Sequence, residues 1–110
     1  MAKPKRMLDW RQVYAVRNEA EVSNFVKANG FLPSVLSDAY QQIGRYFSDS
    51  KLTLELETDP EDGYQQLLIS VPTRLAPAAA LSQLEQFDKD WWLDAMRRAH
   101  GKLCINLAYR

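Results

Sequence analysis

The period of the apolar residues switches between that of a helix and that of a strand along this chain, and this alternation limits the folds it can adopt. From Pro33 to Phe47, apolar residues recur at the three- and four-residue spacing of an amphipathic helix. From Lys51 to Glu57, leucine occupies every second position, which is typical of a strand with one face in solvent. The sequence therefore predicts a domain with separate helices and strands.

The residues after Glu57 predict a β-hairpin. The segment 59–63 has the sequence Asp-Pro-Glu-Asp-Gly, and these residue types favour turns. Residues 64–71 then alternate between apolar and polar side chains, with Leu67 and Ile69 on the apolar side. We therefore expect an antiparallel pair of strands joined by this turn.

Further helices are predicted on both sides of the hairpin. Asn18 and Glu21 have the spacing of an N-terminal capping box, and Gly30 suits a helix end, so a helix is expected over about residues 19–29. Pro77 marks the first turn of another helix, because proline lacks the N–H group that is unpaired there. This helix is expected to continue until Gly101.

A last strand is predicted over residues 103–109, where apolar side chains again occupy every second position. The order of elements is then α-α-β-β-α-β, in a two-layer α+β domain over residues 18–110 with its helices on one face of the sheet. A strand–helix–strand connection should make the joined strands parallel. We place the last strand beside the first, which gives a three-stranded mixed sheet in the order 2-1-3. Residues 1–17 are expected to form a basic tail or a short strand.

Composition narrows the class of protein. A chain of 110 residues has room for one core. Its single cysteine, Cys104, excludes an intrachain disulfide and favours a reducing compartment. We therefore expect the protein to be located in the cytoplasm. There is no apolar run of the length that a membrane span needs. Fourteen basic residues balance fourteen acidic residues, and the acids gather in the middle of the chain, which argues against a general nucleic-acid-binding surface.

Trp91 and Trp92 are the most distinctive residues of the predicted C-terminal helix. Neighbouring helical positions point about 100° apart, so both side chains cannot occupy the centre of one narrow apolar stripe. Trp91 follows Leu84 and Phe87 at seven and four residues, and we therefore assign it to the core. Trp92 is expected beside the core, either packed at its margin or exposed in a protein interface.

Four residues could support chemistry, but their pattern argues against an active site. Asp88 and Asp90 flank the tryptophans, where apolar surroundings could raise the pKa of a carboxyl group, although both fit the solvated face of the helix better. His100 and Cys104 are a base and a nucleophile, but Gly101 separates them and they are too few for a zinc site. We expect no catalytic residue, no cofactor and no metal.

The leading hypothesis is a non-catalytic protein–protein interaction module with a protein partner and no membrane. Its interaction candidates are Trp92, Asp88, Asp90, Arg97 and Arg98. A homodimer is also expected, because a three-stranded sheet has two free edges. One alternative is a small enzyme or ligand-binding domain that uses Asp88, Asp90, His100 and Cys104. Another is a nucleic-acid-associated protein with basic termini, although nucleic acid is the less favoured partner.

The C-terminal helix also carries a recognisable motif. Residues 87–93 form the pattern F-D-x-x-W-W-L, and the stretches 21–36, 58–61, 68–73 and 101–107 accompany it. With these stretches, the chain resembles small bacterial proteins that consist of a domain of unknown function. The resemblance covers most of the chain from residue 19 to residue 109, and it implies no reaction, cofactor or catalytic residue.

Overall fold

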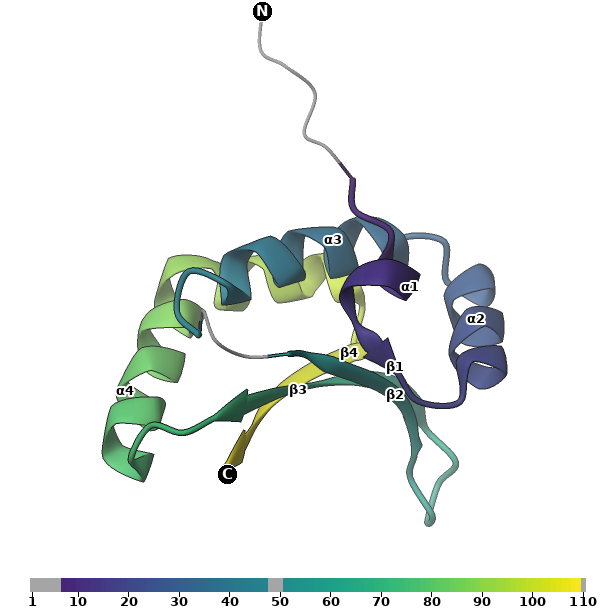
Figure 1. Ribbon diagram of the computed structural model, residues 1–110. Coiled ribbons are helices and arrows are strands. Elements are labelled where there is room, and N and C mark those ends of the chain that lie inside the picture. Colours follow the sequence, from purple (N-terminus) through teal and green to yellow (C-terminus); the bar gives the residue numbers. More distant parts are fainter. Residues whose placement is uncertain (1–6, 48–50, 110) are drawn as a thin grey trace, which may run out of the picture.

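The computed structural model describes residues 7–47 and 51–109 (Figure 1). The helices are α1 (Trp10–Val13), α2 (Glu19–Ala28), α3 (Leu32–Ile43), α4 (Pro77–Phe87) and α5 (Leu93–Ala95). A π-helical turn, η1 (Asp88–Trp92), precedes α5, and a 3-10 turn, η2 (Met96–Ala99), follows it. The strands are β1 (Ala15–Val16), β2 (Thr53–Thr58), β3 (Gln65–Thr73) and β4 (Leu103–Tyr109).

The α+β class and the mixed sheet are confirmed, but the predicted strand order is wrong. The sheet has four strands in the order β1-β2-β3-β4. β1 is parallel to β2, β2 is antiparallel to β3, and β3 is parallel to β4. The helical crossover thus joins neighbouring strands, so the last strand lies beside β3 rather than beside β2.

The outer edge of β2 is taken by the N-terminal segment. The backbone N–H of Ala15 donates to the Leu52 carbonyl, and that of Arg17 donates to the Leu54 carbonyl, each at 2.9 Å. The short strand expected within residues 1–17 is therefore β1, while the basic residues before Met7 lie outside the described residues.

The segment before β1 also belongs to the core. Trp10 and Tyr14 are buried, and the Tyr14 hydroxyl donates a hydrogen bond of 2.7 Å to the Leu36 carbonyl in α3. Burial of these two rings fastens the N-terminal segment to the helical layer, in addition to its pairing in the sheet. The compact unit therefore begins before residue 18.

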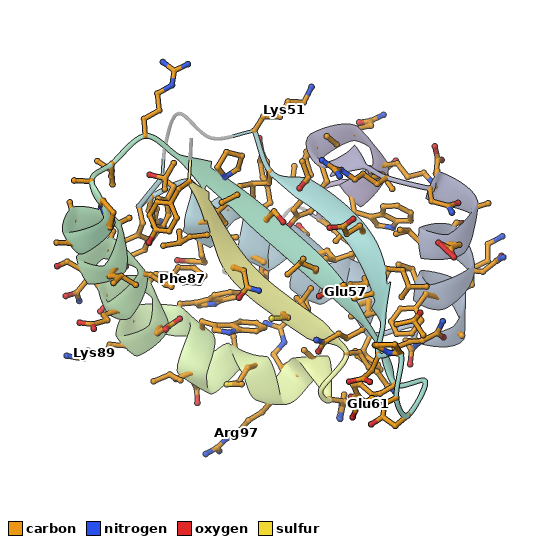
Figure 2. The ribbon with its side chains drawn as sticks, turned by 90° about the horizontal axis from the view of Figure 1, so that it is seen from below. Lys51, Glu57, Glu61, Phe87, Lys89 and Arg97 are labelled. Carbon is orange, nitrogen blue, oxygen red and sulfur yellow. The ribbon has the colours of Figure 1, made fainter. Side chains whose placement is uncertain are left out.

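Helices cover one face of the sheet, and the other face is open (Figure 1). The covered face carries buried apolar side chains from successive strands, including Leu54, Leu67, Ile69 and Ile105. Residues between them, such as Glu55, Ser70 and Asn106, face the open side, which Figure 2 shows from below. This alternation follows from the two-residue period of a strand, and it makes the fold two-layered.

The predicted helices agree with the structure in place but not in every boundary. α2 begins at Glu19, and the side chain of Asn18 donates to the Glu21 carboxylate at 2.9 Å rather than capping a backbone group. α3 ends at Ile43, before Gly44 and earlier than the apolar pattern suggested. The predicted C-terminal helix is the least regular, and its irregularity positions the candidate site.

Candidate functional site

The segments α4, η1, α5 and η2 follow one another without a gap and form what we call the C-terminal helical run, residues 77–99. Its regular α-helical pattern is interrupted between Asp88 and Trp92, where the hydrogen bonds have π-helical spacing. The N–H group of Leu93 donates to the Asp88 carbonyl, five residues earlier. A π-turn accommodates one extra residue, so it rotates everything that follows relative to a continuous α-helix.

This turn reverses the predicted roles of the two tryptophans. Trp92 is buried, with 8% of its surface exposed, whereas Trp91 is only partly buried at the margin of the core. In an α-helix, the residue four positions after Phe87 would return to the core, but the extra residue shifts that place to Trp92. Ala95 and Ala99 then continue the buried stripe. The assignment of Trp91 to the core was wrong, and Trp92 is not an exposed interface residue.

A chain of aromatic contacts attaches the helical run to the segment after α3. The ring of Tyr46 meets Phe87 edge-on at a centroid distance of 5.7 Å, and Phe87 lies 5.7 Å from Trp91. Trp91 and Trp92 follow at 5.8 Å. Such tilted and edge-on arrangements are favoured between aromatic rings, so this chain of contacts supports packing of the run against α3.

Asp90 also helps to attach the C-terminal helical run to the segment after α3. Its carboxylate accepts hydrogen bonds from the Tyr46 hydroxyl at 2.5 Å and from the Gln86 side-chain amide at 2.8 Å. The hydrogen bond to Asp90 is the main reason that the pKa of Tyr46 is raised. Gln83 adds a bond of 3.1 Å to the Tyr46 carbonyl. Both oxygens of Asp90 are thus engaged in packing contacts within the chain.

Asp88 has different surroundings. Its side chain is partly buried, and its carboxylate forms no hydrogen bond or ion pair with any other residue that the structure describes. Burial raises the pKa of this carboxyl group, and the negative charge of Glu85 raises it further. Because Asp90 is bonded to Tyr46 and Asp88 is unpaired, the two carboxylates do not act as one pair.

His100 and Cys104 are not brought together. The His100 ring packs edge-on against Phe31 at 4.7 Å, and its backbone is left-handed with φ 49°. Cys104 lies between the buried residues Leu103 and Ile105 and therefore faces the open side of the sheet. Burial raises the pKa of the Cys104 thiol, and the charge of Glu57 adds to this effect. A thiol with a raised pKa is a poor nucleophile at neutral pH.

Arg97 and Arg98 have separate roles. Arg98 pairs with the Asp38 carboxylate at 2.9 Å and donates to the Ser34 hydroxyl at 3.0 Å, so it joins η2 to α3. Arg97 is exposed and points away from the domain (Figure 2). Arg98 is also exposed, with 45% of its side-chain surface accessible, but its guanidinium group is engaged by α3, whereas Arg97 forms no such contact with the described residues.

Neither a cluster of metal ligands nor a helix suited to crossing a membrane is found in the part of the chain that the structure describes. Within residues 7–47 and 51–109, no three His, Cys, Asp or Glu side chains gather as they would to hold a metal ion. None of the helices in these ranges combines the length and the apolar character that crossing a membrane requires.

Sequence reasoning missed a group of exposed apolar side chains near the C-terminus. Seven large apolar side chains are exposed in the part of the chain that the structure describes, and five of them lie between residue 75 and residue 109. We call these five the C-terminal apolar surface: Leu75, Leu81, Leu93, Met96 and Tyr109. Leu81, Leu93 and Met96 lie within the predicted C-terminal helix, and only their exposure distinguishes them from its buried residues.

The orientation of the helical run explains this exposure. One side of the run faces α3 and the segment that follows α3, through Gln83, Asp90 and Arg98. By helical spacing, Leu81 and Met96 point to the opposite side. They therefore remain exposed, at 51% and 43%.

β4 is the strand next to this surface, and no other strand of the described residues pairs with its outer edge. The N–H of Leu67 in β3 donates to the Lys102 carbonyl at 2.8 Å, in a parallel register that pairs Leu67 with Leu103. Because successive residues of a strand direct their backbone groups to opposite edges, Leu103, Ile105, Leu107 and Tyr109 point theirs away from β3. This edge offers hydrogen-bonding groups for another strand.

Comparisons of the chain with protein-family models, with curated proteins and with solved structures found no match. The resemblance to bacterial proteins that share the F-D-x-x-W-W-L pattern therefore stays a prediction.

Proposed function

We propose that this protein is a non-catalytic protein-interaction module that contacts its partner through the C-terminal apolar surface. The observation that carries this proposal is the concentration of exposed large apolar side chains in the last part of the chain. Single exposed apolar residues are common on proteins, whereas a contiguous apolar patch is typical of an interaction site, and we infer that these side chains contribute to such a patch. We also propose that the protein is located in the cytoplasm, as expected from its single cysteine.

The distribution of the reactive side chains also supports a non-catalytic role. Asp90 is bonded to Tyr46, His100 packs on Phe31, and Cys104 faces the open side of the sheet. General acid–base or nucleophilic catalysis needs such groups within hydrogen-bond reach of one another or of one substrate. The enzyme alternative is therefore less favoured than an interaction module.

A nucleic-acid role has less support as well. Arg98 is paired with Asp38, so it would have to leave this ion pair to neutralise a phosphate group. Arg97 remains exposed, and Arg97→Ala is the variant that tests this alternative without breaking the contact to α3. We expect no salt-dependent binding of duplex DNA or RNA by the original protein. Binding that weakens with salt and is reduced in Arg97→Ala would instead favour the nucleic-acid alternative.

Affinity capture with the intact protein as bait tests the interaction module. The double variant Leu93→Ser/Met96→Ser removes two exposed apolar side chains, and Met7→Ser removes one from the other end of the chain as a matched control. We expect the original protein and the control to retain the same specific protein and the double variant to lose it. Retention by the double variant, with its fold intact by circular dichroism, would contradict the proposal, as would the absence of a specific partner.

A further inference from the structure

We propose that the partner binds as an extended peptide segment that adds a fifth strand to the sheet at the outer edge of β4, with a basic residue placed near Asp88. This inference rests on the proposed function, because it assumes a protein partner, and it adds the conformation and the charge of the segment that is bound. Addition of a strand to a free sheet edge is a recurring mode of peptide recognition, in which backbone hydrogen bonds supply much of the affinity.

The first support is the chemistry of the β4 edge. β4 is seven residues long, Leu103–Tyr109, and contains no proline and no charged residue. Natural edge strands are usually protected from pairing by charges, prolines, bulges or short length. Seven uncharged residues with outward-pointing N–H and C=O groups lack these protections, so this edge can accept another strand.

The opposite edge of the sheet is protected. β1 pairs with the beginning of β2, through Thr53 and Leu54. The remainder of β2 carries Glu55 and Glu57, whose charges disfavour pairing with an added strand. Because only the β4 edge lacks such protection, we expect the partner strand to bind there.

The second support is the position of the helical run. In the view from below, the run lies on the outer side of β4, farther from the middle of the sheet than the strand itself (Figure 2). An added strand would lie about 4.8 Å beyond β4 and therefore on the side of the sheet where the run is found. Its side chains on the helical face would meet exposed residues of the run such as Leu81 and Met96. This contact would cover apolar surface that is now in solvent.

The position of the helical run beyond β4 also favours a peptide segment, rather than a second copy of the chain, as the partner at this edge. Two copies paired through β4 about a twofold axis would both have their helices on the same side of the combined sheet. Each helical run lies beyond its own β4, so the two runs would occupy overlapping space. A peptide segment has no helical layer and avoids this overlap. A homodimer through β4 is accordingly the competing outcome of the experiment.

The third support is charge. Asp88 is partly buried and unpaired among the described residues, and by helical spacing it lies on the same side of the run as Leu81. Glu85 is close enough to raise its pKa. A lysine or arginine of the bound segment would neutralise this local negative charge, because opposite charges across an interface favour association.

The test uses the intact protein and a capped peptide, Val-Thr-Val-Thr-Lys-Thr-Val-Thr-Val, whose lysine shares one face of the extended strand with the valines. Amide hydrogen exchange is then measured by NMR. The peptide is supplied at a concentration on the order of a millimolar, since short extended peptides bind weakly. We expect new protection at Ile105 and Leu107, whose N–H groups point outward. The amides of Cys104 and Asn106 already bond to β3 in this register, so their protection should not change.

Substitutions in β4 separate the backbone contact from side-chain effects. Leu107→Pro removes an outward N–H group, and Leu107→Ala shortens the side chain but keeps that group. We expect at least about tenfold weaker peptide binding for the proline variant than for the alanine variant. Because Leu107 is partly buried, the pair Tyr109→Pro and Tyr109→Ala repeats the comparison at an exposed residue. Near-UV circular dichroism checks that each variant is folded.

The charge contribution is tested separately. Asp88→Asn should weaken binding of the lysine peptide about threefold to fivefold. The same substitution should leave unchanged the binding of a peptide in which glutamine replaces the lysine. Equal loss for both peptides would contradict the placement of a basic residue near Asp88.

Three results would overturn strand addition. They are the absence of protection at Ile105 and Leu107, equal binding by the proline and alanine variants, and sedimentation of the chain as a dimer that Leu107→Pro dissociates. The capture experiment distinguishes a failure of strand addition from a failure of the proposed function. If Leu93→Ser/Met96→Ser abolishes capture while both proline variants capture normally, the interaction module stands without strand addition. If no specific partner is captured at all, the interaction module itself is wrong.

Discussion

The indole rings of Trp91 and Trp92 lie 5.8 Å apart and are tilted by 31°, yet only Trp92 belongs to the buried core. The π-turn that contains both residues produces this difference, because its extra residue places Trp92 where an α-helix would have placed Trp91. The motif therefore combines one tryptophan that stabilises the fold with one that remains partly accessible.

We predict that Trp92→Ala destabilises the protein far more than Trp91→Ala. Removing the buried ring leaves a cavity and should cost about 3–5 kcal/mol in the free energy of unfolding. Removing the partly buried ring should cost about 1–2 kcal/mol, since less apolar area is lost. Urea denaturation followed by circular dichroism measures both values, and a larger loss for Trp91→Ala would contradict the assignment.

A second prediction concerns the deletion of a residue from the π-turn. Removing Lys89, an exposed residue within the turn, should return this segment to α-helical spacing and place Trp92 four residues after Phe87. The core side chains would keep their places, and the cost should be about 1–2 kcal/mol, mainly from the lost contact of Asp90 with Tyr46.

The control for that deletion is removal of Ser82, an exposed residue within regular α4. This change rotates the residues after it by about 100° relative to those before it, and it should destabilise the fold by more than about 3 kcal/mol. Thermal denaturation compares the two proteins. Similar losses for both deletions would argue against the π-turn as an inserted residue.

A third prediction concerns the two neighbouring arginines. Arg98→Ala removes the charged partner of Asp38, whose side chain is only 11% exposed, and should cost about 1–3 kcal/mol. Arg97→Ala changes an exposed side chain and should stay within about 0.5 kcal/mol of the original protein. Chemical denaturation decides between them, and equal effects would show that the contact with α3 contributes nothing measurable.

The fourth prediction is a dependence on pH. The pKa of Asp88 is raised in the folded state by burial and by Glu85, so its ionised form disfavours folding at neutral pH. Asp88→Asn should therefore stabilise the protein at pH 7, by on the order of a few tenths of a kcal/mol because solvent screens this partly exposed group.

This gain has a defined pH window. It should disappear as the pH falls through the raised pKa of the folded protein towards the ordinary value of aspartic acid, near pH 4, because the native carboxyl group is then neutral in both states. Urea denaturation at about pH 7 and about pH 3 measures the difference. A gain that persists at the acidic value would contradict the role of the Asp88 charge.

The periodic segments were predictable because each satisfies a local rule. The leucines between Lys51 and Glu57 and the alternation in residues 103–109 correspond to β2 and β4, since one buried face imposes a two-residue period. β1 was harder to locate, because Ala15 and Val16 are too few to show a period. Its pairing with β2 depends on hydrogen bonds to residues far along the chain.

The candidate site was less predictable than the fold. The spacing from Phe87 to Trp91 is a normal α-helical spacing, so nothing local signals the π-turn that overrides it. Similarly, Leu81 and Met96 are typical residues of an apolar stripe. Their exposure depends on the position of α3 and on the end of the sheet at β4.

The sequence by itself determined the helix and strand segments and the inward face of β2, β3 and β4, because alternation between apolar and polar residues is a local property of the chain. Only the tertiary structure decided which strands are neighbours, which tryptophan is buried and which apolar residues stay in solvent. Those outcomes depend on competition among distant segments for the same edge or the same part of the core. The burial of Trp92 and the position of β4 at the edge of the sheet both result from that competition.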